Sequence, residues 1–262
     1  MKDIKEHPPG TFCWVELATT DGEGAKNFYT QLFGWDFSDQ PVGPDAVYTM
    51  LKLSDQDVGA LYQMSREQKS RGVPPHWNSY ISVANADEIA HEVKALGGTV
   101  LAEPFDVFDA GRMAQCQDPA GATFAVWQPN LHMGVGILNE PGALCWHELA
   151  TNDTKKATEF YTKLFGWGKK VSDIEGMTYT EFLHGERPAG GMLEISKEWG
   201  DVPPNWMVYF AVDDCDTAVD KITSLGGQIK VPPKDIPNVG RFATAQDSQG
   251  AYFSVIKLDN PE

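Results

Sequence analysis

The second half of this chain repeats the first half almost motif by motif. GTFCWVELAT at residues 10–19 returns as GALCWHELAT at residues 142–151, and FYTQLFGW at residues 28–35 returns as FYTKLFGW at residues 160–167. A repeat of roughly 130 residues has the size of a domain, which excludes a solenoid unit. The chain is therefore predicted to be a tandem duplication, with one domain at residues 1–134 and the second at residues 135–262.

Composition limits the classes of protein that the duplication can belong to. Hydrophobic residues make up 42% of the 262 residues and aromatic residues 11%, which is ample for a packed core and argues against disorder. The net charge of −16 would repel phosphate backbones, so no nucleic-acid partner is expected. The chain shows no apolar stretch that approaches a membrane span, and its first residues lack the apolar region of a signal peptide. We expect a cytoplasmic protein without a membrane partner.

Each copy divides again into two similar units. The first unit begins with a strand at residues 11–17 and a helix at residues 21–33, for which Asp21 is the expected N-cap and Gly34 the expected end. Strands follow, and the order starts again after Pro74 and Pro75, with a strand at 78–83, a helix at 87–96 and a last strand at 123–128. The predicted unit is strand–helix–strand–strand–strand, and the chain holds four of them.

The helix motif Asp21-x6-Phe-Tyr-x2-Leu-Phe-Gly, its copy from Asp153 and the matched endings DPAGATF and DSQGAYF together resemble the vicinal oxygen chelate superfamily. That superfamily contains glyoxalases, bleomycin-resistance proteins and extradiol dioxygenases. The resemblance implies an α+β fold of four βαβββ modules. These would form two glyoxalase-like domains, each with a curled, mainly antiparallel sheet around a cleft. The pairing of the modules and the choice between a monomer and a homodimer stay open.

Strand alternation predicts which side chains line the cleft. In the first strand, Cys13, Val15 and Leu17 would pack under the helix, while Phe12 and the two residues at 14 and 16 would face the cleft. In the second copy His147 falls on the side away from the cleft. The same alternation in the later strands gives the candidate ligand-binding residues, which are Trp14, Asn78, Tyr80, Trp127, Trp146, Met207, Tyr209, Tyr252 and Ser254.

The resemblance also implies where a divalent metal would bind. Metal-dependent members carry His, Gln or Glu early in the first strand of a unit and Glu in the last strand. The matching positions here hold residues that are not usual metal ligands: Trp14, Asn78, Trp146, Met207, Ala125 and Ser254. We therefore predict that the metal site is missing and that no cofactor is bound. A metal would be compatible with the resemblance only if Glu16 or Glu148 joined a histidine from a loop, such as His76 or His132.

Three functions are consistent with these patterns. The first is a metal-independent protein that binds an aromatic or apolar small molecule in the cleft. The second is a glyoxalase-like lyase or isomerase, or a dioxygenase-type enzyme, acting on an α-oxo or aromatic metabolite with Glu16 and Glu148 as candidate catalytic bases. The third is a protein-binding role, in which Trp77 and Trp206 would be exposed docking points. Arg112 and Arg241 are expected to pair with carboxylates, for example Asp118 and Asp247.

Overall fold

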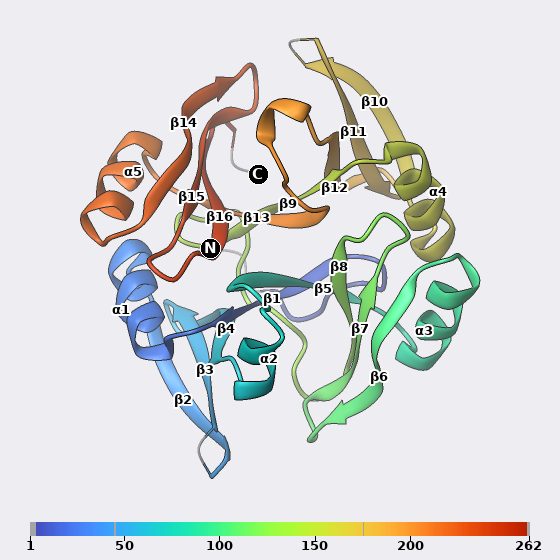
Figure 1. Ribbon diagram of the computed structural model, residues 1–262, viewed down its shortest axis with the longest axis horizontal. Coiled ribbons are helices and arrows are strands. Elements are labelled where there is room, and N and C mark those ends of the chain that lie inside the picture. The colour runs from blue at the N-terminus through green and yellow to red at the C-terminus, as the bar shows by residue number, and fades with distance from the viewer. Residues whose placement is uncertain (1–3, 45, 175, 261–262) are drawn as a thin grey trace.

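The computed structural model describes residues 4–44, 46–174 and 176–260, and it contains two eight-stranded sheets, one from each copy of the repeat (Figure 1). The first sheet has the order β2-β3-β4-β1-β5-β8-β7-β6 and the second the order β10-β11-β12-β9-β13-β16-β15-β14. The strands of the first sheet are β1 (Phe12–Thr19), β2 (Asp36–Gly43), β3 (Ala46–Leu53), β4 (Gln56–Gln63), β5 (His76–Ser82), β6 (Thr99–Val107), β7 (Gly111–Gln117) and β8 (Thr123–Pro129). Those of the second are β9 (Leu144–Thr151), β10 (Gly168–Ile174), β11 (Met177–His184), β12 (Arg187–Glu194), β13 (Asn205–Ala211), β14 (Gln228–Ile236), β15 (Gly240–Gln246) and β16 (Tyr252–Leu258).

The helices begin and end at the residues that local chemistry dictates. Asp21 caps the first helix, because its carboxylate accepts a hydrogen bond of 3.1 Å from the backbone N–H of Gly24, and Gly34 ends it at φ +72°. Asp153 caps the matching helix of the second copy through Lys156 N–H at 2.9 Å. The helical segments are α1 (Gly22–Phe33), α2 (Arg66–Ser70), α3 (Ala86–Ala95), α4 (Thr154–Phe165), the 3₁₀ turn η1 (Lys197–Trp199) and α5 (Cys215–Ser224). None of these helices in the described ranges has the length and apolarity to span a membrane.

The module pairing that the sequence left open is now fixed. Within each sheet, two consecutive modules join through their first strands, so that β1 runs antiparallel to β5 and β9 antiparallel to β13. In each module the first strand also runs parallel to its last strand, as β1 does with β4. The expected α+β fold of four βαβββ modules, paired into two domains with curled sheets, is confirmed.

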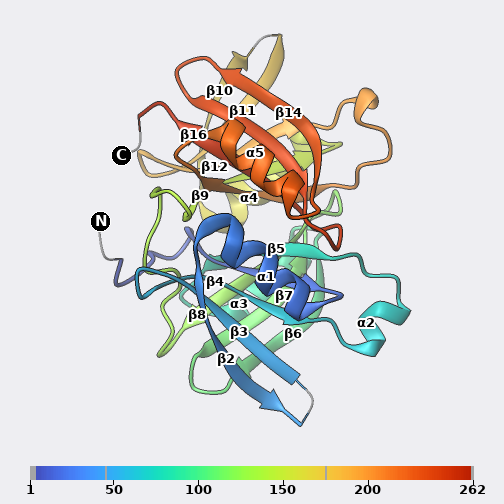
Figure 2. The ribbon, with the colours of Figure 1, turned by 90° about the vertical axis from the view of Figure 1, so that its left-hand side faces the viewer.

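The two largest hydrophobic cores do not lie within single domains but between them. One core joins Phe28 and Tyr29 of α1 to Phe210 and Phe253 of the second sheet. The other core joins residues of the first sheet, among them Phe124, to α4 in the same way. The helices accordingly lie in pairs at the junction, α1 beside α5 and α3 beside α4 (Figure 1). The pair α1 and α5 faces the viewer in Figure 2. Each copy therefore completes the core of the other.

Two buried polar crossings connect the copies inside these cores. The hydroxyl of Tyr29 donates to Asp247 of the second copy at 3.0 Å and accepts from the indole N–H of Trp77 at 3.0 Å. The symmetric crossing runs from Tyr161 to Asp118 at 3.1 Å, with Trp206 donating to Tyr161 at 2.8 Å. Three buried polar groups are satisfied at each crossing.

These crossings correct two predictions made from the sequence. Trp77 and Trp206 are buried with exposed fractions of 6% and 5%, so they are not the exposed docking points that were expected. Asp118 and Asp247 accept the tyrosine hydroxyls rather than ion-pairing with arginine. Arg112 pairs instead with Asp87 at 2.7 Å and Asp106 at 2.9 Å, and Arg241 does the same with Asp216 and Asp235. Both arginines pair with carboxylates, as expected, but the aspartates differ from the two that were predicted.

Replacing Tyr29 by Phe removes the hydroxyl and leaves the buried Asp247 Oδ2 and the Trp77 N–H without that partner. We expect Tyr29→Phe to lower the free energy of unfolding by about 1–3 kcal/mol, and Tyr161→Phe to do the same at the second crossing. The control is Tyr252→Phe, at a tyrosine that is 45% exposed. Chemical denaturation of the four proteins measures the effect. Equal stabilities for the core variants and the control would contradict a structural role for the crossings.

Candidate functional site

The face of each sheet opposite the helices, called here its inner face, carries a repeated group of polar and aromatic side chains. In the second domain Glu148 of β9 accepts a hydrogen bond from the hydroxyl of Tyr209 on β13 at 2.9 Å. Tyr179 of β11 is also hydrogen-bonded to Glu148, and its hydroxyl accepts from the indole N–H of Trp146 at 3.2 Å. A carboxyl group is thus held between two phenols, one of which is fixed by a tryptophan.

The first domain has the same arrangement. Glu16 of β1 accepts from the hydroxyl of Tyr80 on β5 at 3.0 Å and is hydrogen-bonded to Tyr48 of β3. The indole N–H of Trp14 donates to Tyr48 at 3.2 Å. We call the groups Trp14/Glu16/Tyr48/Tyr80 and Trp146/Glu148/Tyr179/Tyr209 the two inner-face clusters.

Burial sets the electrostatics of both clusters. Desolvation raises the pKa of Glu16 and of Glu148 above the ordinary value of 4.5, and the tyrosine hydroxyls that donate to the carboxylates act against this rise. The pKa values of Tyr80 and Tyr209 are raised as well, by burial and by the neighbouring carboxylate charge. A carboxyl group with a raised pKa and two phenols in contact can hold or exchange a proton, or can accept a hydrogen bond from a ligand.

The other predicted ligand-binding residues lie on the inner faces but make contacts of their own. Asn78 and Gln115 form a paired amide contact with hydrogen bonds of 2.9 and 3.1 Å. Ser254 shares a hydrogen bond of 2.9 Å with Thr244. Met207 pairs in register with Glu148 across β9 and β13. The two remaining predicted residues are Trp127, whose indole N–H donates to the carbonyl of His132 at 2.9 Å, and Tyr252, which is exposed at the start of β16.

Strand alternation failed at one place, the start of β1. A register shift between Phe12 and Trp14 turns the chain there, so Phe12 enters the interdomain core and Cys13 joins the inner-face side with Trp14. The predicted directions of Phe12 and Cys13 were therefore wrong. The matching shift opposite β9 places Leu144 in the core.

His147 lies away from the inner face, as the alternation predicts. Its ring stacks on Phe12 with 3.8 Å between the ring centroids, and Nδ1 shares a hydrogen bond of 3.0 Å with the hydroxyl of Ser79. Burial lowers the pKa of His147 to about 3, so this histidine is neutral. It belongs to the domain junction.

Sequence reasoning missed Tyr48 and Tyr179, the tyrosines that connect Trp and Glu in each cluster. A signal was present, because a Tyr-Thr pair occurs at residues 48–49 and again at residues 179–180. The residues around this pair differ between the two copies, so the pair is not recognisable as part of the repeat. Contact with Glu16 or Glu148 also depends on how β3 and β11 lie in the sheets, which the sequence does not specify.

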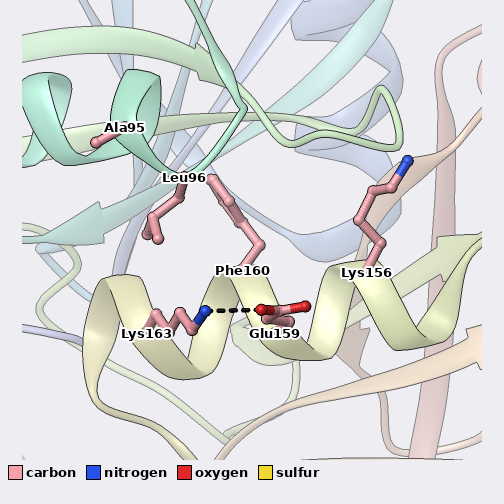
Figure 3. A pocket seen from close by; sticks show the side chains of 6 residues that line it. All are labelled: Ala95, Leu96, Lys156, Glu159, Phe160 and Lys163. Carbon is pink, nitrogen blue, oxygen red and sulfur yellow. Dashed lines mark hydrogen bonds and ion pairs between the residues drawn. The ribbon is translucent and has the colours of Figure 1, made fainter.

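A surface groove of about 260 Å³ lies elsewhere, between α3 and α4 (Figure 3). Leu96 and Phe160 form its apolar part, and an ion pair of 2.7 Å joins Lys163 to Glu159 at its edge. The groove is open to solvent and none of its lining residues belongs to an inner-face cluster. Paired surface charges of this kind have little binding energy of their own.

A divalent metal on an inner face would need several protein ligands close together. Catalytic zinc sites, for example, use three protein ligands, drawn from imidazole, thiolate and carboxylate groups. Across residues 4–44, 46–174 and 176–260, no three His, Cys, Asp or Glu side chains come together in such a group. Each inner-face cluster contributes one carboxylate, whose hydrogen-bonded neighbours are phenols. Neither inner-face cluster, among the residues that the structure describes, supplies the three protein ligands that such a site uses.

Comparison with known proteins agrees with this architecture. Residues 11–126 and 143–255 each match the model of the glyoxalase/bleomycin resistance protein/dioxygenase superfamily, and the chain belongs to that family. It is 43% identical over 259 residues to CFP32 of Mycobacterium tuberculosis, whose name includes the word glyoxylase, with 98% of each chain covered. It is 35% identical over 265 residues to the anthracycline biosynthesis protein DnrV of Streptomyces peucetius, with 95% of this chain and 94% of that protein covered.

Solved structures share the fold at low sequence identity. The Mn(II)-bound glyoxalase from Novosphingobium aromaticivorans superimposes with a TM-score of 0.64 at 16% identity, covering 97% of this chain and 86% of that one. The 2,2',3-trihydroxybiphenyl 1,2-dioxygenase from Sphingomonas wittichii gives a TM-score of 0.66 at 12% identity, covering 95% and 90%. These similarities establish the tandem architecture but do not assign a reaction.

The raised pKa values of Glu16 and Glu148 predict how stability depends on pH. Because the folded state holds these protons more tightly than the unfolded state, the carboxyl groups favour folding at low pH, and this advantage is lost as pH rises through the folded-state pKa. The Glu16→Gln/Glu148→Gln variant keeps a neutral group at all pH values. The free energy of unfolding of this variant, relative to that of wild type, should therefore increase as pH rises above about 4.5. The total increase should be about 1.4 kcal/mol for each unit by which the pKa values of Glu16 and Glu148, added together, are raised.

Denaturation curves of both proteins between pH 4 and pH 8 measure this difference. Glu92→Gln, at an exposed glutamate of α3, is the matched control for the removal of a carboxylate charge. A difference for the double variant that does not change with pH would show that the two carboxyl groups have ordinary pKa values.

Proposed function

We propose that this protein binds a planar aromatic small molecule at an inner-face cluster, and that it does so without a divalent metal. The observation that carries the proposal is the repeated cluster itself, in which a tryptophan, two tyrosines and a glutamate meet on the face opposite the shared cores. Aromatic side chains offer flat apolar contact with favourable stacking geometry. The glutamate adds one directional hydrogen-bond acceptor. Aromatic contacts with a few polar groups are the usual combination in a small-molecule site.

The relationship to DnrV supports the aromatic class of ligand. That relative is named as an anthracycline biosynthesis protein, and anthracyclines contain a hydroxylated anthraquinone. A hydroxyl on such a ring system can donate to a carboxylate, which accepts more hydrogen bonds than the two that Glu148 receives from Tyr179 and Tyr209. The ligand class proposed for this protein is therefore a hydroxylated, fused-ring aromatic compound.

The donor set supports the metal-independent part of the proposal. A metal in this family would need imidazole or carboxylate ligands, and each cluster supplies one carboxylate among phenols and an indole. On this proposal the side chains that hold a metal in other superfamily members are replaced by side chains that hold an aromatic ring.

A second candidate is a glyoxalase-like lyase or isomerase. It is favoured by the raised pKa of Glu148, which makes this carboxylate a better general base near neutral pH. The carboxylate would take the proton from the carbon that bears the hydroxyl group and return it to the carbonyl carbon. The hydroxyl proton would pass to the former carbonyl oxygen, so that the hydroxyl and the carbonyl exchange places. Tyr209, whose hydroxyl donates to Glu148, is the candidate hydrogen-bond donor to the carbonyl oxygen.

Binding of 1,4-dihydroxyanthraquinone tests the first candidate. Because the ligand would lie against tryptophan, we expect a titration to quench the tryptophan fluorescence of the wild-type protein and to saturate. The Glu148→Gln variant should bind more weakly, by roughly 10- to 150-fold, because a hydrogen bond to a charged acceptor is worth roughly 1.5–3 kcal/mol. Naphthalene, which lacks hydroxyl groups, is the matched control ligand and should bind both proteins alike. Absence of saturable quenching in wild type would contradict the proposed function.

The lyase candidate has its own test. If Glu16 and Glu148 act as bases, the Glu16→Gln/Glu148→Gln variant should lose about 10²–10⁴-fold of kcat on a methylglyoxal–glutathione hemithioacetal. Turnover is followed by thioester absorbance, with the Glu92→Gln variant as the control for general effects of charge removal. Full turnover by the double variant would eliminate this mechanism.

A further inference from the structure

The two inner faces differ in what lies on top of them. In the first domain the chain segment after β8, residues 130–138, crosses the inner face and is hydrogen-bonded to it. The backbone N–H of Val135 donates to the carbonyl of Cys13 at 2.8 Å, and that of Gly136 donates to the carbonyl of Asp57 at 2.8 Å. We call residues 130–138 the inner-face strap.

Side chains of the strap occupy the space beside the first cluster. The imidazole of His132 meets Trp14 edge to face, with 4.5 Å between the ring centroids. Its Nε2 lies 3.7 Å from the carboxylate of Asp57. Val135 is fully buried in a hydrophobic cluster that also contains Trp14 and Tyr80. The strap thus places an aromatic ring and an apolar side chain where a ligand of the first domain would lie.

The second domain lacks a charged side chain that faces the strap in the first domain, the carboxylate of Asp57. By the register of the parallel pairs, Ala60 of β4 corresponds to Gly191 of β12, so that Asp57 corresponds to Pro188. Proline has no side-chain charge to attract an imidazole. Gly191 packs directly against the Tyr179 hydroxyl, which a Cβ at that position would meet.

Burial of equivalent residues follows the same asymmetry. In the first domain Cys13 is 0% and Trp14 5% exposed. In the second domain Cys145 and Trp146 are both partly exposed. The cluster around Glu148 is the more accessible of two otherwise matching groups.

We propose that the protein binds its aromatic ligand at one site per chain, the inner-face cluster of the second domain, and that the strap fills the first domain in place of a ligand. This inference rests on the proposed function and specifies its site. His132 against Trp14 shows the kind of group that the cluster accepts, a flat ring placed against the indole. In the second domain Trp146 is partly exposed, and on this proposal a ring of the ligand takes the corresponding position against it.

Stoichiometry of 1,4-dihydroxyanthraquinone binding tests the inference, measured by fluorescence titration at protein concentrations well above the dissociation constant. Wild type should bind about one equivalent. Trp146→Ala should weaken binding by about tenfold through loss of stacking and apolar contact, and Trp146→Phe should restore most of it. These variants leave the strap unchanged.

A second pair of variants opens the first domain. His132→Gly/Val135→Gly removes the ring and the apolar side chain of the strap and should raise the stoichiometry to about two equivalents. Leu131→Ala is the matched control, because Leu131 lies in the same segment but is 71% exposed, and it should stay at one equivalent. Far-UV circular dichroism and thermal melting verify that each variant is folded.

The outcomes separate the inference from the proposed function. Two equivalents bound by wild type, or unchanged affinity in Trp146→Ala, would overturn the assignment to the second domain while leaving aromatic binding in place. No saturable binding by wild type would overturn both. The inference would be established if wild type binds one equivalent, if Trp146→Ala weakens that binding about tenfold, and if the His132→Gly/Val135→Gly variant binds a second equivalent.

Discussion

The structure depends on the sharing of each hydrophobic core by both copies of the repeat. Each curled sheet has one apolar face that must be buried. Helices of the same copy and helices of the opposite copy together cover that face. The crossings from Tyr29 to Asp247 and from Tyr161 to Asp118 satisfy the buried polar groups that this arrangement creates. Because the helix-side faces are buried at the junction, the proposed ligand site lies on the inner faces.

The inner faces combine features that are costly for stability and useful for recognition. Placing Glu148 between two phenols removes a carboxylate from water, which raises its pKa and favours the protonated form in the folded state. Such groups are concentrated at functional sites, because stability alone would be better served by an apolar residue. Duplication has preserved the group twice, while the strap at residues 130–138 makes the two copies unequal.

Much of the fold could be predicted from the sequence, because its signals are local. The Asp21 cap, the end at Gly34 and the strand–helix order of each module all follow from a few neighbouring residues, and α1 begins and ends as predicted. Alternation also placed Tyr80, Trp146 and Tyr209 on the inner faces, where the structure has them. The family resemblance supplied the tandem domain architecture, which the comparisons confirm.

The remaining features depend on contacts between distant segments. The register shift at Phe12 reverses two side chains and leaves no mark in the hydrophobic pattern. Arg112 was assigned to the wrong carboxylate because Asp87 and Asp106 reach it from two other elements. The role of the strap was missed for the same reason, since residues 130–138 have the composition of an ordinary linker. Their contacts with Cys13 and Asp57 exist only in the folded chain.

The central claim is that an aromatic ligand binds to this protein without a metal. The most direct measurement is the melting temperature of the wild-type protein with 1,4-dihydroxyanthraquinone in a buffer that contains excess EDTA. The account predicts a rise in melting temperature that depends on ligand concentration, and the same rise when the chelator is omitted. A rise that appears only after Mn²⁺ is added would contradict it.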